Sequence, residues 1–262
     1  MTDTADQQDP SPEPEIPPAL ATAWGVRPRP GKGPKPGLSV GRIVQAATQT
    51  ALKEGLSAVS MNRVAAEVGT AAMSLYRYVS GKDELLTLMV DAAFGPPPDI
   101  PEPDDDWRSG LARWARLMLE RMRQNLWAVR VPISGPPTTP NQVAWLERGL
   151  RCLTGTPLDP GEKMSIMLLV SGIVRSEAQL DAQLADVYKS SGPVGDAAMT
   201  EYSRILAALA DRERFPALHE ILDSGVLSQA DESGEDFDFA LERVLDGIQT
   251  YITRSSTESR TS

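Results

Sequence analysis

The sequence predicts an all-α protein with two parts, a small N-terminal head of three short helices and a larger C-terminal helical bundle. Three observations support this. Apolar residues recur at helical spacing from residue 38 to about residue 252. No segment alternates apolar and polar residues with the period of two that marks a half-buried strand. Serine, threonine and glycine lie at the ends of these apolar repeats, where they would cap the starts and ends of helices.

Residues 1–36 are rich in proline and glycine, acidic at first and basic in the last part, RPRPGKGPKPG. Such a composition buries too little apolar surface to fold, so we expect a disordered tail. Its basic part has two interpretations, a solvated linker or an arm that follows a DNA backbone or enters a minor groove.

The chain carries no sign of export or membrane insertion. Its start lacks the basic residues and the apolar stretch of a signal peptide, and no run of 18 apolar residues could span a membrane. The one cysteine, Cys152, excludes an internal disulfide and suits a reducing compartment. We therefore expect a cytoplasmic protein with no membrane partner.

Two amphipathic helices are predicted at the start of the head, which spans residues 37–98. The first runs from a Ser39 cap to Gly55, and the second begins at Ser60 and stops at Gly69, where glycine can take a positive φ. The apolar face of the first consists of Val40, Ile43, Val44, Ala47 and Ala51, and that of the second of Met61, Val64, Ala65 and Val68.

A third helix is predicted from Ala71 to Tyr78, with Thr70 as its N-cap. A further helix follows a capping box at Ser80, in which Asp83 reaches back to the helix start. The apolar face of this last helix consists of Leu85, Leu88, Met89 and Ala92. The proline-rich segment GPPPDIPEP, residues 95–103, then breaks the helical pattern, so we place the domain boundary between residues 98 and 99.

The C-terminal domain, residues 99–255, is predicted to be helical throughout. A long helix at 160–189 is apolar almost all round between Met164 and Val174, and another lies at 196–214. The remaining helices show as apolar stripes. These stripes are Trp107, Leu111, Trp114, Met118 and Met122, then Val143, Leu146, Leu150 and Leu153, and finally Phe237, Leu241, Val244, Leu245, Ile248 and Ile252.

Three polar features of this domain have simple interpretations. The aspartates at 104–106 fit either a cation site or the N-terminus of a helix, whose dipole favours acids. His219 is expected to be exposed or to cap a helix. Residues 254–262 are polar, and we expect them to be frayed.

Charge is divided unevenly along the chain. The window from Val26 to Lys82 holds nine basic residues and two acidic ones, a net charge of +7, whereas the rest holds 17 basic and 34 acidic residues, a net charge of −17. The basic window can neutralise phosphates. The acidic remainder would be repelled by DNA, or it serves only solubility. The pattern favours a DNA-binding head.

The head contains a helix-turn-helix pattern, since two short helices flank a glycine turn at residues 60–80. The stretch from Leu75 to Leu85, LYRYVSGKDEL, resembles the LYxHFxxKxEL signature of the TetR family of bacterial repressors (TetR/AcrR type). It departs from this signature at Tyr78, where the family has histidine, and at Val79, where phenylalanine is common. The resemblance covers residues 38–94. Phe237 to Ile248 resembles the last helix of an actinobacterial-type TetR C-terminal domain.

The resemblance implies which residues of the head contact DNA. Ser60 and Asn62 would meet phosphate or a base edge, and Tyr76, Tyr78 and Lys82 would meet phosphates. The small face of Ala72, Met73 and Ser74 would lie against the bases. Two residues remain to be placed. The third helix would be the recognition helix, which enters the major groove. Arg77, its long cation, could read a guanine, and Arg63 is either solvated or phosphate-facing.

Because this helix has few long polar side chains, we expect DNA shape and backbone contacts to carry much of the specificity. Tyr76 has a second interpretation, in which it packs against the first helix instead of contacting phosphate.

In this family the C-terminal helices form a dimer and enclose an effector pocket. The helices near 160–189 and 236–254 would form the homodimer, although the first could instead be buried within one subunit. A dimer would place two recognition helices about 34 Å apart on a palindromic operator of double-stranded DNA. The pocket candidates are large adaptable side chains, which can also be plain core residues. They are Trp114, Met118, Met122, Trp127, Trp145, Met164 and Met167.

The sequence thus favours a homodimeric transcriptional repressor that a small apolar effector releases from its operator. Alternatives are an activator, a ligand-independent regulator, or a helical interaction protein that binds no DNA. The chain has no nucleophile elbow, phosphate-binding loop or dinucleotide fingerprint, so we do not expect an enzyme. With one histidine and one cysteine, we expect neither a metal site nor a cofactor.

Overall fold

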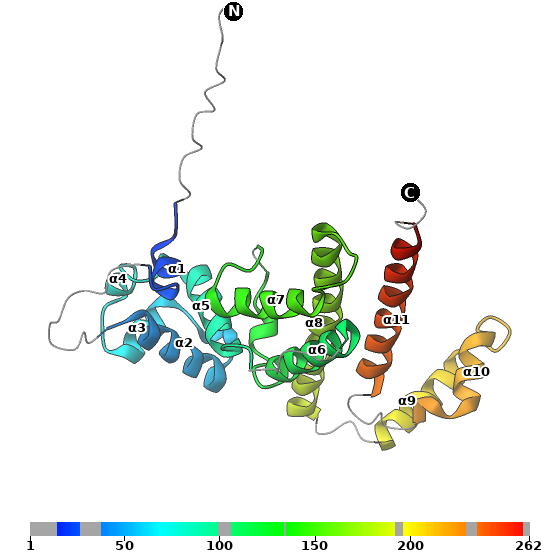
Figure 1. Ribbon diagram of the computed structural model, residues 1–262. Coiled ribbons are helices and arrows are strands. Elements are labelled where there is room, and N and C mark those ends of the chain that lie inside the picture. Colours follow the sequence, from blue (N-terminus) through cyan, green and yellow to red (C-terminus); the bar gives the residue numbers. More distant parts are fainter. Residues whose placement is uncertain are drawn as a thin grey trace, which may run out of the picture. The chain divides into compact units, whose positions relative to one another are not determined.

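The computed structural model describes residues 15–26, 38–98, 106–133, 135–191, 196–228 and 235–258. Every regular element in these ranges is a helix, which confirms the all-α prediction (Figure 1). The chain divides into two compact units. The first is Met1–Ala92 with Thr138–Pro140, and from here on the word head means this unit. The second is Ala93–Pro137 with Asn141–Ser262, and it is called the body. The boundary between the units, after Ala92, lies six residues before the boundary at residues 98 and 99 that the sequence suggests.

The N-terminal segment contains a helix that the sequence analysis missed. Helix α1, Pro18–Ala23, starts at a proline, which the first position of a helix tolerates because its N–H would be unpaired there. The indole Nε1 of Trp24 donates a hydrogen bond of 2.8 Å to the carbonyl oxygen of Thr138. The expectation of a disordered tail is therefore wrong for residues 18–24. Residues 1–14 and 27–36 lie outside the described ranges.

Helices α2, Val40–Glu54, and α3, Met61–Val68, form as predicted, with the 3-10 helix η1, Leu56–Ala58, between them. The Ser39 hydroxyl accepts a hydrogen bond from the Arg42 N–H at 3.3 Å. Gly69 takes a φ of 76°, a left-handed conformation that few other residues adopt, and this ends α3. The buried residues of the two helices are Ile43, Val44, Ala47, Thr50 and Ala51, then Met61, Val64 and Ala65.

The recognition helix is shorter than predicted. Helix α4 spans only Ala72–Leu75, its N-cap is Ala71 rather than Thr70, and no side chain caps it. Past Leu75 the chain turns, because the N–H groups of both Tyr78 and Val79 donate to the Leu75 carbonyl. Leu75 and Val79 are buried.

Helix α5, Lys82–Phe94, corrects a detail of its capping. The carboxylate that reaches back is that of Glu84, not Asp83. Its Oε2 accepts from the Ser80 N–H at 2.5 Å and from the Ser80 hydroxyl at 2.6 Å. Since the helix starts at Lys82, Glu84 occupies its third position, and Ser80 lies one residue before the N-cap Gly81, so the contact differs from the predicted capping box.

Leu85, Leu88 and Met89 of α5 are buried, whereas Ala92 is exposed, contrary to the predicted apolar face.

The described helices of the body are α6, Trp107–Arg123, η2, Ala128–Arg130, α7, Pro140–Cys152, α8, Pro160–Ser191, α9, Asp196–Leu209, α10, Pro216–Ser224, η3, Val226–Ser228, and α11, Glu235–Glu258.

Helix α6 packs against α8 and α11, and α8 also packs against α11 (Figure 1). Helices α9 and α10 pack against each other and against η3. The Asp106 carboxylate accepts from the Ser109 N–H at 2.9 Å and caps α6, so the helix-start interpretation holds for this aspartate. Asp104 and Asp105 lie outside the described ranges.

Two expectations for the body need correction. His219 is buried, so the exposed alternative is wrong. Its ring Nε2 lies 2.7 Å from the carbonyl oxygen of Ala210, the residue that follows α9, as the capping alternative expects. Helix α11 continues to Glu258, so the residues from 254 to 258 are helical.

Candidate DNA-binding surface and effector core

The recognition helix presents an apolar tip and one cation to solvent. Met73 is 76% exposed and Tyr76 is 47% exposed. Arg77 is also exposed, whereas Ala72, Ser74 and Tyr78 are half-buried. Such a surface can approach a DNA groove closely but has few groups that can read a base edge. Recognition through DNA shape and backbone contacts therefore stays our prediction.

The flanking helix starts carry the other predicted DNA contacts. Ser60 and Asn62 are exposed at the N-terminus of α3, where the Ser60 hydroxyl accepts from the Arg63 N–H at 3.2 Å. Lys82 is exposed at the N-terminus of α5. Unpaired N–H groups at a helix start favour phosphate, and a lysine there adds charge.

Arg63 is arranged differently from the other predicted contacts. Its Nη2 lies 2.6 Å from Glu54 Oε1, and its Nη1 lies 3.0 Å from Glu67 Oε2. The hydrogen bond from Arg63 is the main cause that lowers the pKa of Glu54. The structure therefore places this guanidinium on two carboxylates of the head.

Five of the seven predicted pocket residues come together in the buried core of the body: Trp114, Met118, Met122, Trp145 and Met167. The two indoles meet edge to face, with centroids 6.4 Å apart and an interplanar angle of 71°. Trp114 Nε1 donates to the Trp145 carbonyl oxygen at 2.9 Å, and Trp145 Nε1 donates to the Gly95 carbonyl oxygen at 3.1 Å. These bonds fix both rings.

The other two pocket candidates lie elsewhere. Trp127 is buried in the turn after α6, and its Nε1 has no hydrogen-bond partner in the described part of the chain. Met164 is 47% exposed on α8, so the structure does not place it in the core with the other methionines.

Gly149 is a core residue that the sequence analysis missed. A Cβ at this position would lie 2.1 Å from Met167 Cε and 3.1 Å from Trp114 Cε2. The Met167 thioether thus fills the space that a side chain on α7 would take. The one signal in the sequence is that Gly149 follows Trp145 by four residues, because residues four apart lie on the same face of a helix.

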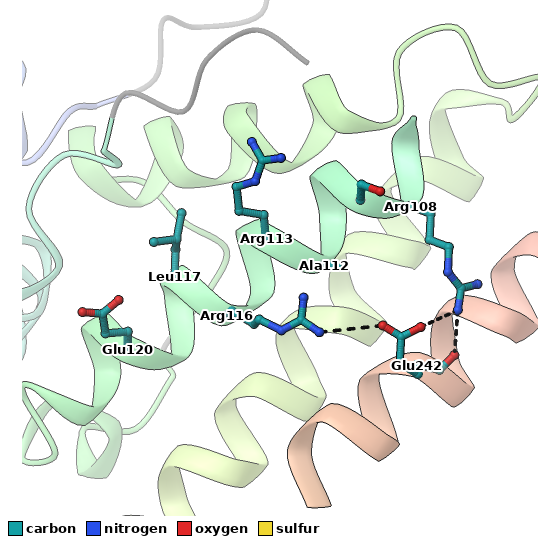
Figure 2. Close-up of a pocket in the computed structure, with 8 residues that line it drawn as sticks. Arg108, Ala112, Arg113, Arg116, Leu117, Glu120 and Glu242 are labelled. Atoms are coloured by element: carbon teal, nitrogen blue, oxygen red, sulfur yellow. Dashed lines mark hydrogen bonds and ion pairs between the residues drawn. The ribbon is translucent and has the colours of Figure 1, made fainter. Parts of the chain in front are cut away.

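A groove of about 460 Å³ lies on the body along α6 and α11 (Figure 2). At its α11 side Glu242 stands between two arginines of α6. Arg108 Nη2 lies 2.6 Å from Glu242 Oε2 and 2.7 Å from Asp246 Oδ1, and Arg116 Nε lies 2.8 Å from Asp238 Oδ1. The sequence shows this spacing. Arg108 and Arg116 are eight residues apart, and the acids Asp238, Glu242 and Asp246 recur every four residues.

This charge network predicts acid sensitivity. The hydrogen bond from Arg108, followed by that from Arg243, lowers the pKa of Asp246. A carboxyl with a lowered pKa in the folded state stabilises that state above its unfolded pKa of about 3.9, and this contribution is lost as pH falls through the folded value. We expect Asp246→Asn to lower the melting temperature slightly at neutral pH and to lose this deficit below about pH 4.

Melting curves of wild type and variant across this pH range provide the measurement. Asp236→Asn, on the same helix but outside the network, is the control. A deficit of Asp246→Asn that does not depend on pH would contradict the assignment.

A basic head with a helix-turn-helix, joined to a separate helical unit with its own core, defines a helix-turn-helix DNA-binding regulator. Residues 43–89 match the tetR family of bacterial regulatory proteins, and residues 100–252 match the tetracyclin repressor-like C-terminal domain. The chain belongs to the TetR family. No helix in the described ranges is long and apolar enough to cross a membrane.

The HTH-type transcriptional repressor DrrR1 of Streptomyces coeruleorubidus is 36% identical over 251 residues, which cover 92% of this chain and 88% of the relative. The crystal structure of apo ActR from Streptomyces coelicolor is similar, with a TM-score of 0.68, 27% identity and coverage of 82% of this chain and 98% of ActR. ActR in complex with (S)-DNPA gives a TM-score of 0.66, 25% identity and the same coverage.

Proposed function

We propose that the protein is a homodimeric repressor that a small apolar ligand releases from its operator. The observation that carries the proposal is the separation of a helix-turn-helix head from a body whose core contains two packed tryptophans and three methionines. Two relatives support it. DrrR1 is a transcriptional repressor, and ActR has been crystallised with a small molecule, (S)-DNPA.

The surface of α8 and α11 supports a dimer. Helix α8 has two apolar sides, since Met167, Val170 and Val174 are buried in the body while Leu168 is 76% exposed. Its partner α11 exposes Phe239 at 65%. Exposed apolar surface on two packed helices marks an interaction site. We infer that two copies pair here as a four-helix interface, whose other exposed apolar residues are Leu169, Leu180, Leu184, Val187 and Tyr251.

Through this dimer two recognition helices would meet successive turns of a palindromic operator. Within each head, Met73 and Arg77 would approach the bases, while Tyr76 and Lys82 would bind the backbone. These side chains are all exposed, and no described acid forms an ion pair with Arg77 or Lys82. Ser60, Asn62, Ala72, Ser74 and Tyr78 would complete the contact.

A ligand would enter the body beside the paired indoles. Methionine side chains can repack around an incoming apolar molecule at low cost, which is why we assign the ligand to this core. Coupling of about 1–3 kcal/mol between ligand and operator would suffice to release the DNA. A regulator with the same head could instead activate transcription or respond to no ligand, and the release assay below tests the second of these cases.

The proposal is tested by a footprint on the DNA upstream of the protein's own gene, followed by release assays. The probes are (S)-DNPA and a panel of apolar aromatic compounds, with fluorescence anisotropy of the protected duplex as the readout. We expect a protected palindrome and a compound that weakens binding at least about tenfold, a coupling of about 1.4 kcal/mol, while the dimer stays intact. A compound that tightens binding would overturn release. Absence of any protected site would contradict an operator in this upstream DNA.

A further inference from the structure

The two acidic residues of the basic window are directed at one cation. Between Val26 and Lys82 the sequence holds only Glu54 and Glu67 as acids. Glu54, at the end of α2, accepts from Arg63 Nη2 at 2.6 Å and from Nε at 3.5 Å, and Glu67, one turn along α3, accepts from Nη1 at 3.0 Å. The three side chains carry a combined charge of −1 in a window whose net charge is +7.

Arg63 lies among the predicted DNA contacts. It lies in the first turn of α3, next to the exposed Asn62 and hydrogen-bonded through its own N–H to the Ser60 cap. Its side chain remains 39% exposed, so burial does not keep it from DNA. Its guanidinium donors instead point at carboxylates, which compete with phosphate for the same planar fork.

The other cations of this surface are not held in this way. Arg77 and Lys82 are exposed, and no ion pair joins either of them to an acid within the described residues. Each is available to a phosphate, or to a base edge in the case of Arg77. Arg63 is the cation of the α3 start, and it is already occupied.

We propose that Glu54 and Glu67 withhold Arg63 from the DNA backbone, so that each head binds duplex DNA through one phosphate contact fewer than its basic residues offer. Backbone contacts strengthen binding to every sequence and carry no base information. Withholding one contact therefore lowers the affinity for DNA in general, and the two glutamates act as positioning residues for the arginine.

The experiment measures the salt dependence of DNA affinity with the full-length protein. The probes are a duplex selected from random DNA by the wild-type protein and a shuffled duplex of equal length and composition. The variants are Glu54→Gln/Glu67→Gln, Arg63→Gln and the triple combination, with Lys82→Gln as the reference for a lost phosphate contact. Melting curves establish that all of them fold.

We expect the double variant to bind both duplexes more tightly and to steepen the slope of log K against log salt by about 0.9 per subunit. The triple variant should return close to the wild-type slope, and Lys82→Gln should flatten it. An unchanged slope in the double variant would overturn the proposal. So would steepening that persists in the triple variant, which indicates general repulsion, or flattening by Arg63→Gln alone, which indicates a contact already made.

Discussion

Replacing Trp114 by alanine is expected to destabilise the body by about 3–5 kcal/mol. The Trp114 side chain is 1% exposed, meets the Trp145 ring edge to face and donates to the Trp145 carbonyl oxygen. Its removal leaves a cavity between α6 and α7 and removes a buried hydrogen bond. Neighbouring Met167, held against Gly149, can fill only part of the space.

The measurement is calorimetric unfolding at one fixed protein concentration, because the stability of an oligomer depends on concentration. Trp107→Ala is the matched control, since Trp107 lies on the same helix but is only partly buried. We expect the control to cost clearly less. Equal effects of the two substitutions would contradict the assigned packing of the core.

Replacing Leu75 by alanine is expected to destabilise the head by about 2–5 kcal/mol and to abolish operator binding. Helix α4 has four residues, too few to be stable alone, and Leu75 is its buried residue. Without this anchor the recognition helix loses its position against α3, so the exposed Met73 and Arg77 lose theirs.

Hydrogen exchange read out on peptides from residues 61–89 measures the effect on the head separately from the body. The control, Met73→Ala, changes the same helix at a side chain that is 76% exposed, and we expect it to alter stability by less than about 0.5 kcal/mol. Full protection of these peptides in Leu75→Ala would show that α4 is held by something other than this side chain.

Periodicity predicted the long elements well, for a physical reason. Helices such as α2 and α6 bury one face over several turns, so their apolar spacing is fixed by the core and can be counted in the sequence. The ends of the short helices were predicted wrongly, because neighbouring residues compete for the same capping position. Thr70 looked like a cap, but the chain places Ala71 there, and the start of α5 at Lys82 transfers the reaching carboxylate from Asp83 to Glu84.

The side chains of the candidate site were predictable in type but not in partner. Exposure of Met73 and burial of Trp114 follow from their places on amphipathic helices. The pairing of Arg63 with Glu54 spans nine residues and two helices, so it depends on the angle at which α2 meets α3. Trp24 docked on Thr138 spans 114 residues, a distance over which no spacing rule operates.

The paired indoles also give the protein a built-in optical label. The chain has five tryptophans, and two of them, Trp114 and Trp145, lie edge to face at 6.4 Å in the core. Aromatic rings this close couple electronically, so their near-ultraviolet circular dichroism depends on the angle between them. A molecule that enters beside the rings, as we propose, changes their surroundings or the angle between them. Its arrival can then be followed in the unmodified protein, without a dye and without DNA.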